Sequence, residues 1–330
     1  MADRKFQLPP LLRSGDTVTA IAPSGSLKNT LALEQGLAIW RKRGYKVKLG
    51  LNYDQVNGYL AGSDRERRAA LQSAWLDPES KAILGIRGGY GATRLLEEWQ
   101  WDLRVTPKWL IGFSDITALL WSLATVNIGS LHAPVLTTLA DEPDWSHARM
   151  FNFLETGNSD SLEGKTWHQG QAKGILLPGN LTVATHLLKT PWQPDLTGVI
   201  LALEDVTEYP YRIDRLLTQW RSLGLLQQVK GIALGRFSRC EPYPGTTSWT
   251  ITEVLRDRLY LLINLYRTMG DGKEVEIKRC DRLSCFYSLP NPDYLRCDLH
   301  FLTNLYNSLV VCSRATASIN FWAVSICPCS

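Results

Sequence analysis

The first 239 of the 330 residues contain no cysteine, and Cys240 is the first one in the chain. None of the seven cysteines forms a C-x-x-C pair, so a zinc site is not expected, and an odd number without a secretion signal argues against a disulfide framework. The charged N-terminus lacks the apolar segment of a signal peptide. No run approaches the roughly 20 apolar residues of a membrane helix. We therefore expect a cytoplasmic protein without a metal or a membrane contact.

An excess of one charge is also lacking, since 36 basic and 32 acidic residues leave a net charge of +4. This balance offers no basic surface for nucleic acid. The dinucleotide fingerprint fails, because Arg94 stands where the third glycine after Gly89-x-Gly91 is required. The "GKT" at 164–166 has Ser159 in place of the first phosphate-loop glycine. The sequence therefore predicts neither a nucleic-acid partner nor a nucleotide cofactor.

Strand and helix patterns alternate along most of the chain. The β-rich runs "GDTVTAIAPSG", "KVKLG", "KAILGI" and "WLIGF" are each followed by a helical or turn-rich segment. This alternation indicates βαβ units, a mostly parallel sheet and helices on both faces, which is an α/β fold. We predict an N-terminal α/β domain with the nucleophile over 1–140, a linker with one helix over 141–172 and a smaller C-terminal α/β domain over 173–259.

The last segment, 260–330, differs from everything before it. It is rich in Cys, Tyr and Ser, and it has no clean helical or strand period. Local and global signals agree in foldable sequences, and here they do not. Our hypothesis is that the reading frame shifts near Leu259–Tyr260, and translation of the other frames of the gene past codon 259 would test it.

The stretch "WLIGFSDITALLWSLA" places Ser114 between an apolar strand and an amphipathic helix. A serine at such a corner projects into the cleft at the carboxyl end of the strand. The helix start and the N–H of Asp115 could then stabilise an oxyanion. The alternative is that Ser114 or Asp115 is simply the N-cap of the following helix.

Two further segments carry candidate site residues. The loop "GIRGGYGATRLL" contains Gly88, Gly89 and Gly91, whose backbone N–H groups could approach an anion. The run "LALEDV" places Glu204 and Asp205 at the end of an apolar strand, where open α/β sheets bind ligands. A carboxylate there could orient a histidine that activates the serine, or it could be a capping or loop carboxylate.

Histidine is scarce, and no pattern singles out a catalytic base. His132 and His186 lie in apolar patterns typical of packed or supporting residues. His147 and His168 fall in the linker, and His300 lies in the anomalous segment.

Taken together, several ordered blocks resemble the LD-carboxypeptidase family of serine peptidases, which contains the muramoyltetrapeptide carboxypeptidases and the microcin-immunity peptidases. The blocks are "IAPSG", "AGSDRERRAAL", "IRGGYGATRLL", "IGFSDITALL", "LHAPV", "PGNLTV", "LEDVTEYPYRIDRLL" and "KGIALGRF", between about Leu11 and Leu259. The resemblance implies a flavodoxin-like N-terminal domain, a smaller C-terminal domain and often a homodimer. It also implies a cytoplasmic peptidase that needs no cofactor and removes D-alanine from murein tetrapeptides during peptidoglycan recycling.

The resemblance also implies roles for individual residues. Ser114 matches the nucleophile, the N–H groups of Asp115 and Gly89 match the oxyanion hole, and Glu204 matches the carboxylate of a Ser-His-Glu triad. An exopeptidase must bind a free carboxylate, and Arg87 beside the glycine loop is our candidate, with an ordinary surface arginine as the alternative.

One departure from the family pattern bears on activity. The family's triad histidine follows the segment written here as "ITEVLRDRL", but the next residues, "YLLINLYRTMGDGKEVEIKRC", contain none, which leaves His300 as a remote candidate. Loss of a triad member costs several orders of magnitude in rate, so the chain as written is expected to be nearly inactive. Two alternatives follow: a catalytically silent binding protein, and an immunity peptidase acting on a peptidyl-nucleotide antibiotic.

Overall fold

The computed structural model describes residues 6–159, 161, 164, 167, 170–268, 311–312 and 316–321. The strands are β1 (Thr17–Ile21), β2 (Lys46–Leu49), β3 (Ser80–Gly85), β4 (Trp109–Gly112), β5 (Leu131–His132), β6 (Gly170–Asn180), β7 (Ile200–Val206), β8 (Gly231–Ser238), β9 (Val311–Cys312) and β10 (Thr316–Phe321). The helices are α1 (Thr30–Lys42), α2 (Asp64–Leu76), α3 (Ala92–Leu96), α4 (Thr117–Thr125), α5 (Leu136–Leu139), α6 (Asp144–Thr156), α7 (Leu181–His186), α8 (Pro210–Ser222) and α9 (Ile251–Thr268), with a 3-10 turn η1 (Ser114–Ile116).

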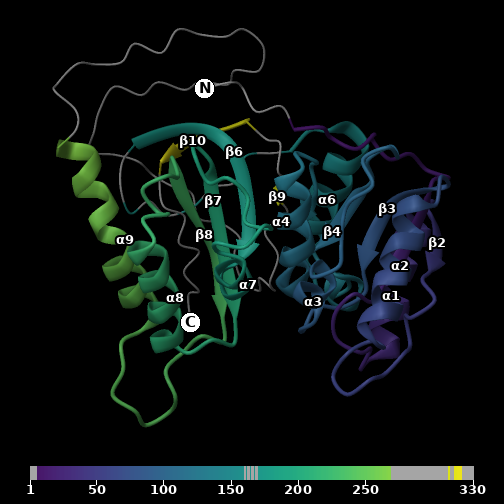
Figure 1. Ribbon diagram of the computed structural model, residues 1–330, viewed down its shortest axis with the longest axis horizontal. Coiled ribbons are helices and arrows are strands. Elements are labelled where there is room, and N and C mark those ends of the chain that lie inside the picture. The colour runs from purple at the N-terminus through teal and green to yellow at the C-terminus, as the bar shows by residue number, and fades with distance from the viewer. Residues whose placement is uncertain are drawn as a thin grey trace, which may run out of the picture.

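The first sheet has the strand order β2-β1-β3-β4-β5-β9 (Figure 1). The first five of these strands pair in parallel, and β9 pairs antiparallel to β5. The order of the five parallel strands is that of flavodoxin-like folds. Apolar residues of α1, α5 and α6 cover one face of this sheet, and those of α2, α3 and α4 cover the other.

The second sheet has the order β10-β6-β7-β8, with β6, β7 and β8 parallel and β10 antiparallel to β6. Apolar residues of α7, α8 and α9 pack on one face, in the same cluster as those of α4. The predicted fold class, α/β with a mostly parallel sheet and a second, smaller sheet, is therefore confirmed. Helix α6 lies within the segment predicted as a linker, 141–172, and β6 begins near its end; the domain boundaries stay a prediction.

The expected change of pattern near Leu259–Tyr260 falls inside a helix. The backbone of α9 continues to Thr268, and most of the remaining segment, including His300, lies outside the described residues. The frame-shift hypothesis therefore stays a prediction. No helix in the described ranges is long and apolar enough to cross a membrane.

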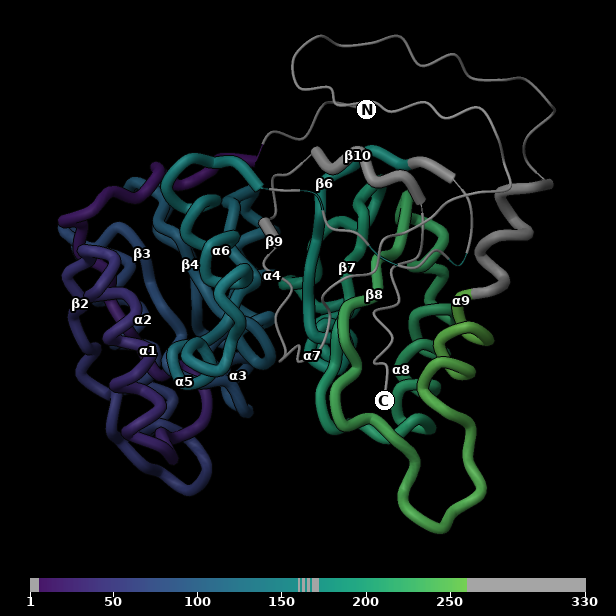
Figure 2. The backbone as a smooth tube through the Cα atoms, turned by 180° about the vertical axis from the view of Figure 1, so that it is seen from behind, coloured from purple at the N-terminus to yellow at the C-terminus, as the bar shows by residue number. Residues whose placement is uncertain are grey.

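Helix α4 connects the two sheets. Its residues from Thr117 to Ala124 are all buried, and both backbone views place it between the sheets (Figures 1 and 2). The indole N–H of Trp121 donates to the Pro178 carbonyl at 2.9 Å, and the Asn180 N–H donates to Thr117 Oγ1 at 3.0 Å. The sequence pattern predicts an amphipathic helix here, but the helix is buried on all sides, and β6 supplies the cover that the first sheet cannot.

Candidate active site

Ser114 occupies a sharp corner between β4 and α4. Its φ is +59°, a left-handed conformation that is unusual for a non-glycine residue and costs about 1 kcal/mol or more. The N-cap interpretation is wrong for Ser114 and Asp115, because no side chain caps the start of η1 or of α4. The serine hydroxyl is thus held in a strained turn without serving the helix, as expected of a nucleophile elbow.

The glycine loop lies directly against this corner. A Cβ built on Gly88 would come within 3.0 Å of both Cβ and Oγ of Ser114, and within 3.7 Å of the Asp115 nitrogen. The loop backbone can approach the hydroxyl only because this side chain is missing. Gly89 follows with φ +110°, again left-handed. Because the first N–H groups of a helix have no partner within it, the N–H of Asp115 can face an oxyanion next to Gly89.

The Asp115 side chain has a separate, structural task. It is buried, and its carboxylate accepts a hydrogen bond from the Ala92 N–H at 2.8 Å, at the start of α3. Burial raises the pKa of Asp115, and the nearby Arg67 guanidinium opposes that shift. This contact ties the elbow to the glycine loop, since α3 begins where the loop ends.

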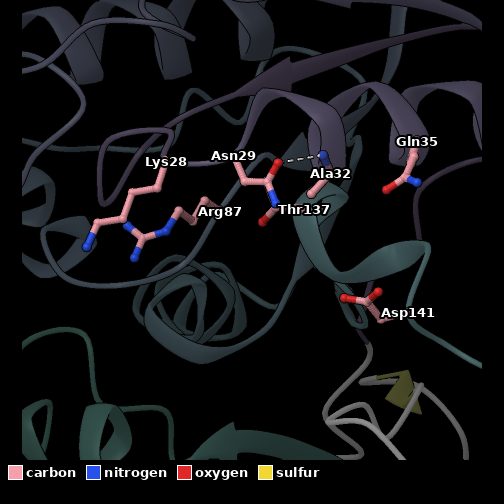
Figure 3. A pocket seen from close by; sticks show the side chains of 7 residues that line it. All are labelled: Lys28, Asn29, Ala32, Gln35, Arg87, Thr137 and Asp141. Carbon is pink, nitrogen blue, oxygen red and sulfur yellow. Dashed lines mark hydrogen bonds between the residues drawn. The ribbon is translucent and has the colours of Figure 1, made fainter.

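Arg87 is half-buried and folds over the loop after β1. Its Nη1 donates to the Ser26 carbonyl at 3.3 Å. It lines a pocket of about 270 Å³ together with Lys28, Asn29, Ala32, Gln35, Thr137 and Asp141 (Figure 3). In that view the Lys28 and Arg87 side chains lie together at one end and Asp141 at the other. The role of Arg87 in binding a carboxylate stays a prediction, with an ordinary surface arginine as the alternative.

Glu204 and Asp205 lie on β7, as predicted, but they differ in their partners. The Asp205 carboxylate accepts hydrogen bonds from Asn180 Nδ2 at 3.1 Å, from the Thr182 N–H and hydroxyl at 2.9 and 2.8 Å, and from the Val206 N–H at 2.8 Å. Asp205 is therefore a structural residue. Glu204 is 5% exposed, and its Oε1 has no hydrogen-bond partner among the described residues. Burial, and then the neighbouring Asp205, raise the pKa of Glu204 well above 4.5.

His132 lies beside Glu204, a pairing that the sequence did not predict. Its Nε2 is 3.7 Å from Glu204 Oε1, and its ring packs edge-on against Phe113. The imidazole is 1% exposed, and burial lowers its pKa to about 4. The available signal was its place at the end of β5, paired in register with Gly112. This position places His132 near the turn that carries Ser114. It does not predict that Glu204, from the other sheet, lies next to the imidazole.

Two other described histidines are bound to the backbone. His147 Nε2 lies 2.6 Å from the Leu139 carbonyl, and His186 Nδ1 lies 2.6 Å from the Thr182 carbonyl. His168 and His300 lie outside the described residues. Within the described ranges, His132 is therefore the histidine paired with Glu204.

The chain matches two models of one family, one for each of its domains. Residues 18–133 match the LD-carboxypeptidase N-terminal domain, and residues 173–265 match the LD-carboxypeptidase C-terminal domain.

The chain aligns with three curated relatives over most of the length of each relative. A Synechocystis protein provisionally named a carboxypeptidase is 56% identical over 78% of this chain and 85% of its own. A Bacillus subtilis protein provisionally named a murein peptide carboxypeptidase is 35% identical over 76% and 81%. The murein tetrapeptide carboxypeptidase of Pseudomonas aeruginosa is 31% identical over 68% and 77%.

Two solved structures have the same fold. A muramoyltetrapeptide carboxypeptidase from Oxalobacter formigenes aligns with a TM-score of 0.65 at 28% identity, over 77% of this chain and 84% of that one. The microcin-immunity protein MccF in complex with glutamyl sulfamoyl guanosine aligns with a TM-score of 0.69 at 21% identity, over 77% and 86%. The second likeness concerns the fold alone.

Proposed function

Because this chain belongs to the LD-carboxypeptidase family, we propose that it is a serine carboxypeptidase that hydrolyses an L,D peptide bond and releases the C-terminal D-alanine of a murein tetrapeptide. The observation that carries the proposal is the left-handed Ser114, with the Gly88 backbone against its hydroxyl. A relative named a murein tetrapeptide carboxypeptidase supports the choice of substrate. The resemblance also leads us to propose a cytoplasmic homodimer that acts in peptidoglycan recycling.

The proposed reaction follows the geometry of the elbow. Ser114 Oγ attacks the carbonyl carbon that precedes the D-residue, and its proton passes to a histidine. The N–H groups of Asp115 and Gly89 hold the oxyanion of the tetrahedral intermediate. The D-amino acid leaves with the proton from the histidine, and water then hydrolyses the acyl-enzyme by the same steps in reverse.

The free carboxylate of the substrate needs a cationic partner. Arg87 immediately precedes Gly88, the glycine whose backbone lies against Ser114, and its side chain lines the pocket next to this loop. Lys28 at the same end of the pocket adds a second positive charge. These two side chains support an anion-binding subsite for the C-terminal carboxylate.

A second candidate is a catalytically silent peptide-binding protein. It is favoured by the absence of histidine from residues 260–280, where the family pattern has its triad histidine, because Glu204 then lacks that histidine to orient. His300 could supply the base, and it lies outside the described residues.

The test is D-alanine release from murein tetrapeptide by the purified full chain and by Ser114→Ala. Release that disappears in the variant supports the proposed enzyme. Peptide binding without release, equal in both proteins, favours the silent protein. Hydrolysis of a peptidyl nucleotide but not of the tetrapeptide points to an immunity peptidase.

A further inference from the structure

We propose that Arg67 is a positioning residue: its buried guanidinium fixes the backbone of the glycine loop and so keeps the Gly89 N–H directed at the oxyanion formed by attack of Ser114. The effect on the reaction rests on the proposed function. The effect on the loop does not, because it follows from hydrogen bonds that the guanidinium makes with the backbone.

Arg67 is a completely buried arginine on α2. Its exposed fraction is 0%, whereas Arg65 on the same helix is exposed. Burial of a guanidinium costs free energy unless its N–H donors are paired. The acceptors of Arg67 therefore indicate which parts of the structure this side chain holds.

Two of these acceptors are backbone carbonyls in two different loops. Arg67 Nη1 donates to the Gly91 carbonyl at 2.8 Å, at the end of the glycine loop, and to the Pro23 carbonyl in the loop after β1. A Cβ built on Gly91 would lie 2.8 Å from the same Nη1, so the guanidinium can approach this backbone only because residue 91 is glycine. One side chain therefore joins the loop after β1 to the glycine loop.

The loop after β1 also binds the glycine loop at its other end. The Gly25 N–H donates to the Gly88 carbonyl at 3.1 Å. Gly89 and Tyr90 therefore lie between two carbonyls that are both hydrogen-bonded. An N–H group that is already fixed in direction stabilises an oxyanion without any reorganisation during the reaction.

Asp64 holds the guanidinium in place and links it to α3. Its carboxylate accepts a hydrogen bond from Arg67 Nη2, and it also accepts from Arg94 Nε at 2.9 Å and Arg94 Nη2 at 2.6 Å. Arg94 lies on α3, which begins directly after the glycine loop. Asp64 thus offsets the charge of the buried guanidinium and fixes the helix that follows the loop.

The segment that carries the nucleophile is bound to the same part of the loop. The Asp115 carboxylate accepts from the Ala92 N–H at 2.8 Å, and Ala92 directly follows the Gly91 that Arg67 binds. A displaced Gly91 carries Ala92 with it, and the Asp115 carboxylate then loses its donor. Because Asp115 follows Ser114 in the chain, Arg67 acts on the nucleophile through the loop backbone.

A purely structural role of Arg67 makes a different prediction. If Arg67 only stabilised the fold, its removal would lower the amount of folded protein, and each folded molecule would react at the normal rate. If Arg67 positions the loop, its removal changes each folded molecule, and the change is concentrated in residues 86–96. The two roles therefore differ in where the backbone loosens and in what happens to kcat.

The first experiment is amide hydrogen exchange of the full chain, Arg67→Gln and Arg68→Gln, followed by mass spectrometry. Arg68 lies on the same helix and pairs with Glu98, so the control variant also loses an ion pair. In Arg67→Gln we expect exchange in the peptide 86–96 to rise by about tenfold or more, with exchange in β7 unchanged and no rise in the control. An unchanged rate in 86–96, or an equal rise throughout the protein, would overturn the proposal. If Arg67→Gln does not fold, Arg67→Lys takes its place, because lysine keeps the charge beside Asp64 but lacks the planar set of donors.

The second experiment measures D-alanine release by Arg67→Gln, Gly88→Ala and the double variant. Each single variant should lower kcat by about a hundredfold and leave KM unchanged, because a displaced loop weakens a contact made in the transition state. The double variant should lose no more than either single variant, because both changes act on the same loop. Independent losses would multiply to about 10⁴-fold, and that result overturns the positioning role, as does an unchanged kcat in Arg67→Gln.

Failure of the proposed function appears in a different measurement, as release that is indifferent to Ser114→Ala. The hydrogen-exchange comparison remains decisive for the loop in that case, because it needs no substrate.

Discussion

The two sheets contribute to the site in different ways. In the first sheet, the glycine loop follows β3, and the strained serine and the start of a helix follow the adjacent strand β4. The second sheet contributes Glu204, a buried carboxyl whose Oε1 lies 3.7 Å from Nε2 of His132 on the first sheet. The proposed nucleophile therefore depends on one turn and one loop, whereas the surroundings of the proposed triad carboxylate depend on how the two sheets meet.

The largest predicted effect comes from removing the proposed nucleophile on the first sheet. Ser114→Ala deletes the attacking oxygen, so D-alanine release should fall by about 10⁴-fold or more. A matched control is Ser73→Ala, which removes an exposed hydroxyl from α2 and should leave release unchanged. Release that survives Ser114→Ala would show that the first sheet does not supply the nucleophile.

The next effect blocks the same corner without changing its chemistry. Gly88→Ala places a methyl group within 3.0 Å of Ser114 Oγ, so we expect a loss of about 10²-fold in kcat/KM. The control is Gly58→Ala, where φ is +61° and no atom lies within 4 Å of the new Cβ, so that a cost to stability is expected without a loss of activity. Equal activity in both variants would contradict the close approach of loop and serine.

A smaller effect concerns substrate binding. Arg87→Ala removes one of the two cations of the pocket, and we expect KM to rise about tenfold with little change in kcat, as for the loss of one charge-assisted hydrogen bond. The exposed Arg65 on α2 is the matched control. If kcat falls and KM does not change, Arg87 acts on the reaction step and not in recognition.

The smallest effect compares the stability of the two halves. Ser63 and Glu66 form a capping box at the start of α2, and Thr250 and Glu253 form the same arrangement at the start of α9. Ser63→Ala and Thr250→Ala should each lower the free energy of unfolding by about 1 kcal/mol. Calorimetry with both variants also measures cooperativity, since a single shifted transition in each case means that the sheets unfold together.

Most of the fold and part of the site could be predicted from the sequence. Alternating strand and helix patterns lead to the parallel sheets, and the position of Ser114 between an apolar strand and the following helix indicates the corner that the backbone adopts. These signals are local, because each depends on neighbours within a few residues.

The contacts that were missed are not local. No spacing in the sequence shows that Asp205 is saturated by Asn180 and Thr182 while Glu204 is not, since both end the same apolar strand. The partnership of His132 with Glu204 depends on the packing of β5 against an element of the other sheet. The pattern of one strand carries no information on that packing.

The complete burial of α4 from Thr117 to Ala124 has a consequence for biosynthesis. The polypeptide is made from its N-terminus, and the Pro178 carbonyl that receives the Trp121 indole is synthesised 57 residues after that tryptophan. Until β6 has been synthesised, the apolar residues of α4 that will pack against it stay exposed to water. The incomplete chain is therefore expected to bind chaperones. An N-terminal fragment that stops before β6 should therefore precipitate when expressed alone, however complete its own sheet.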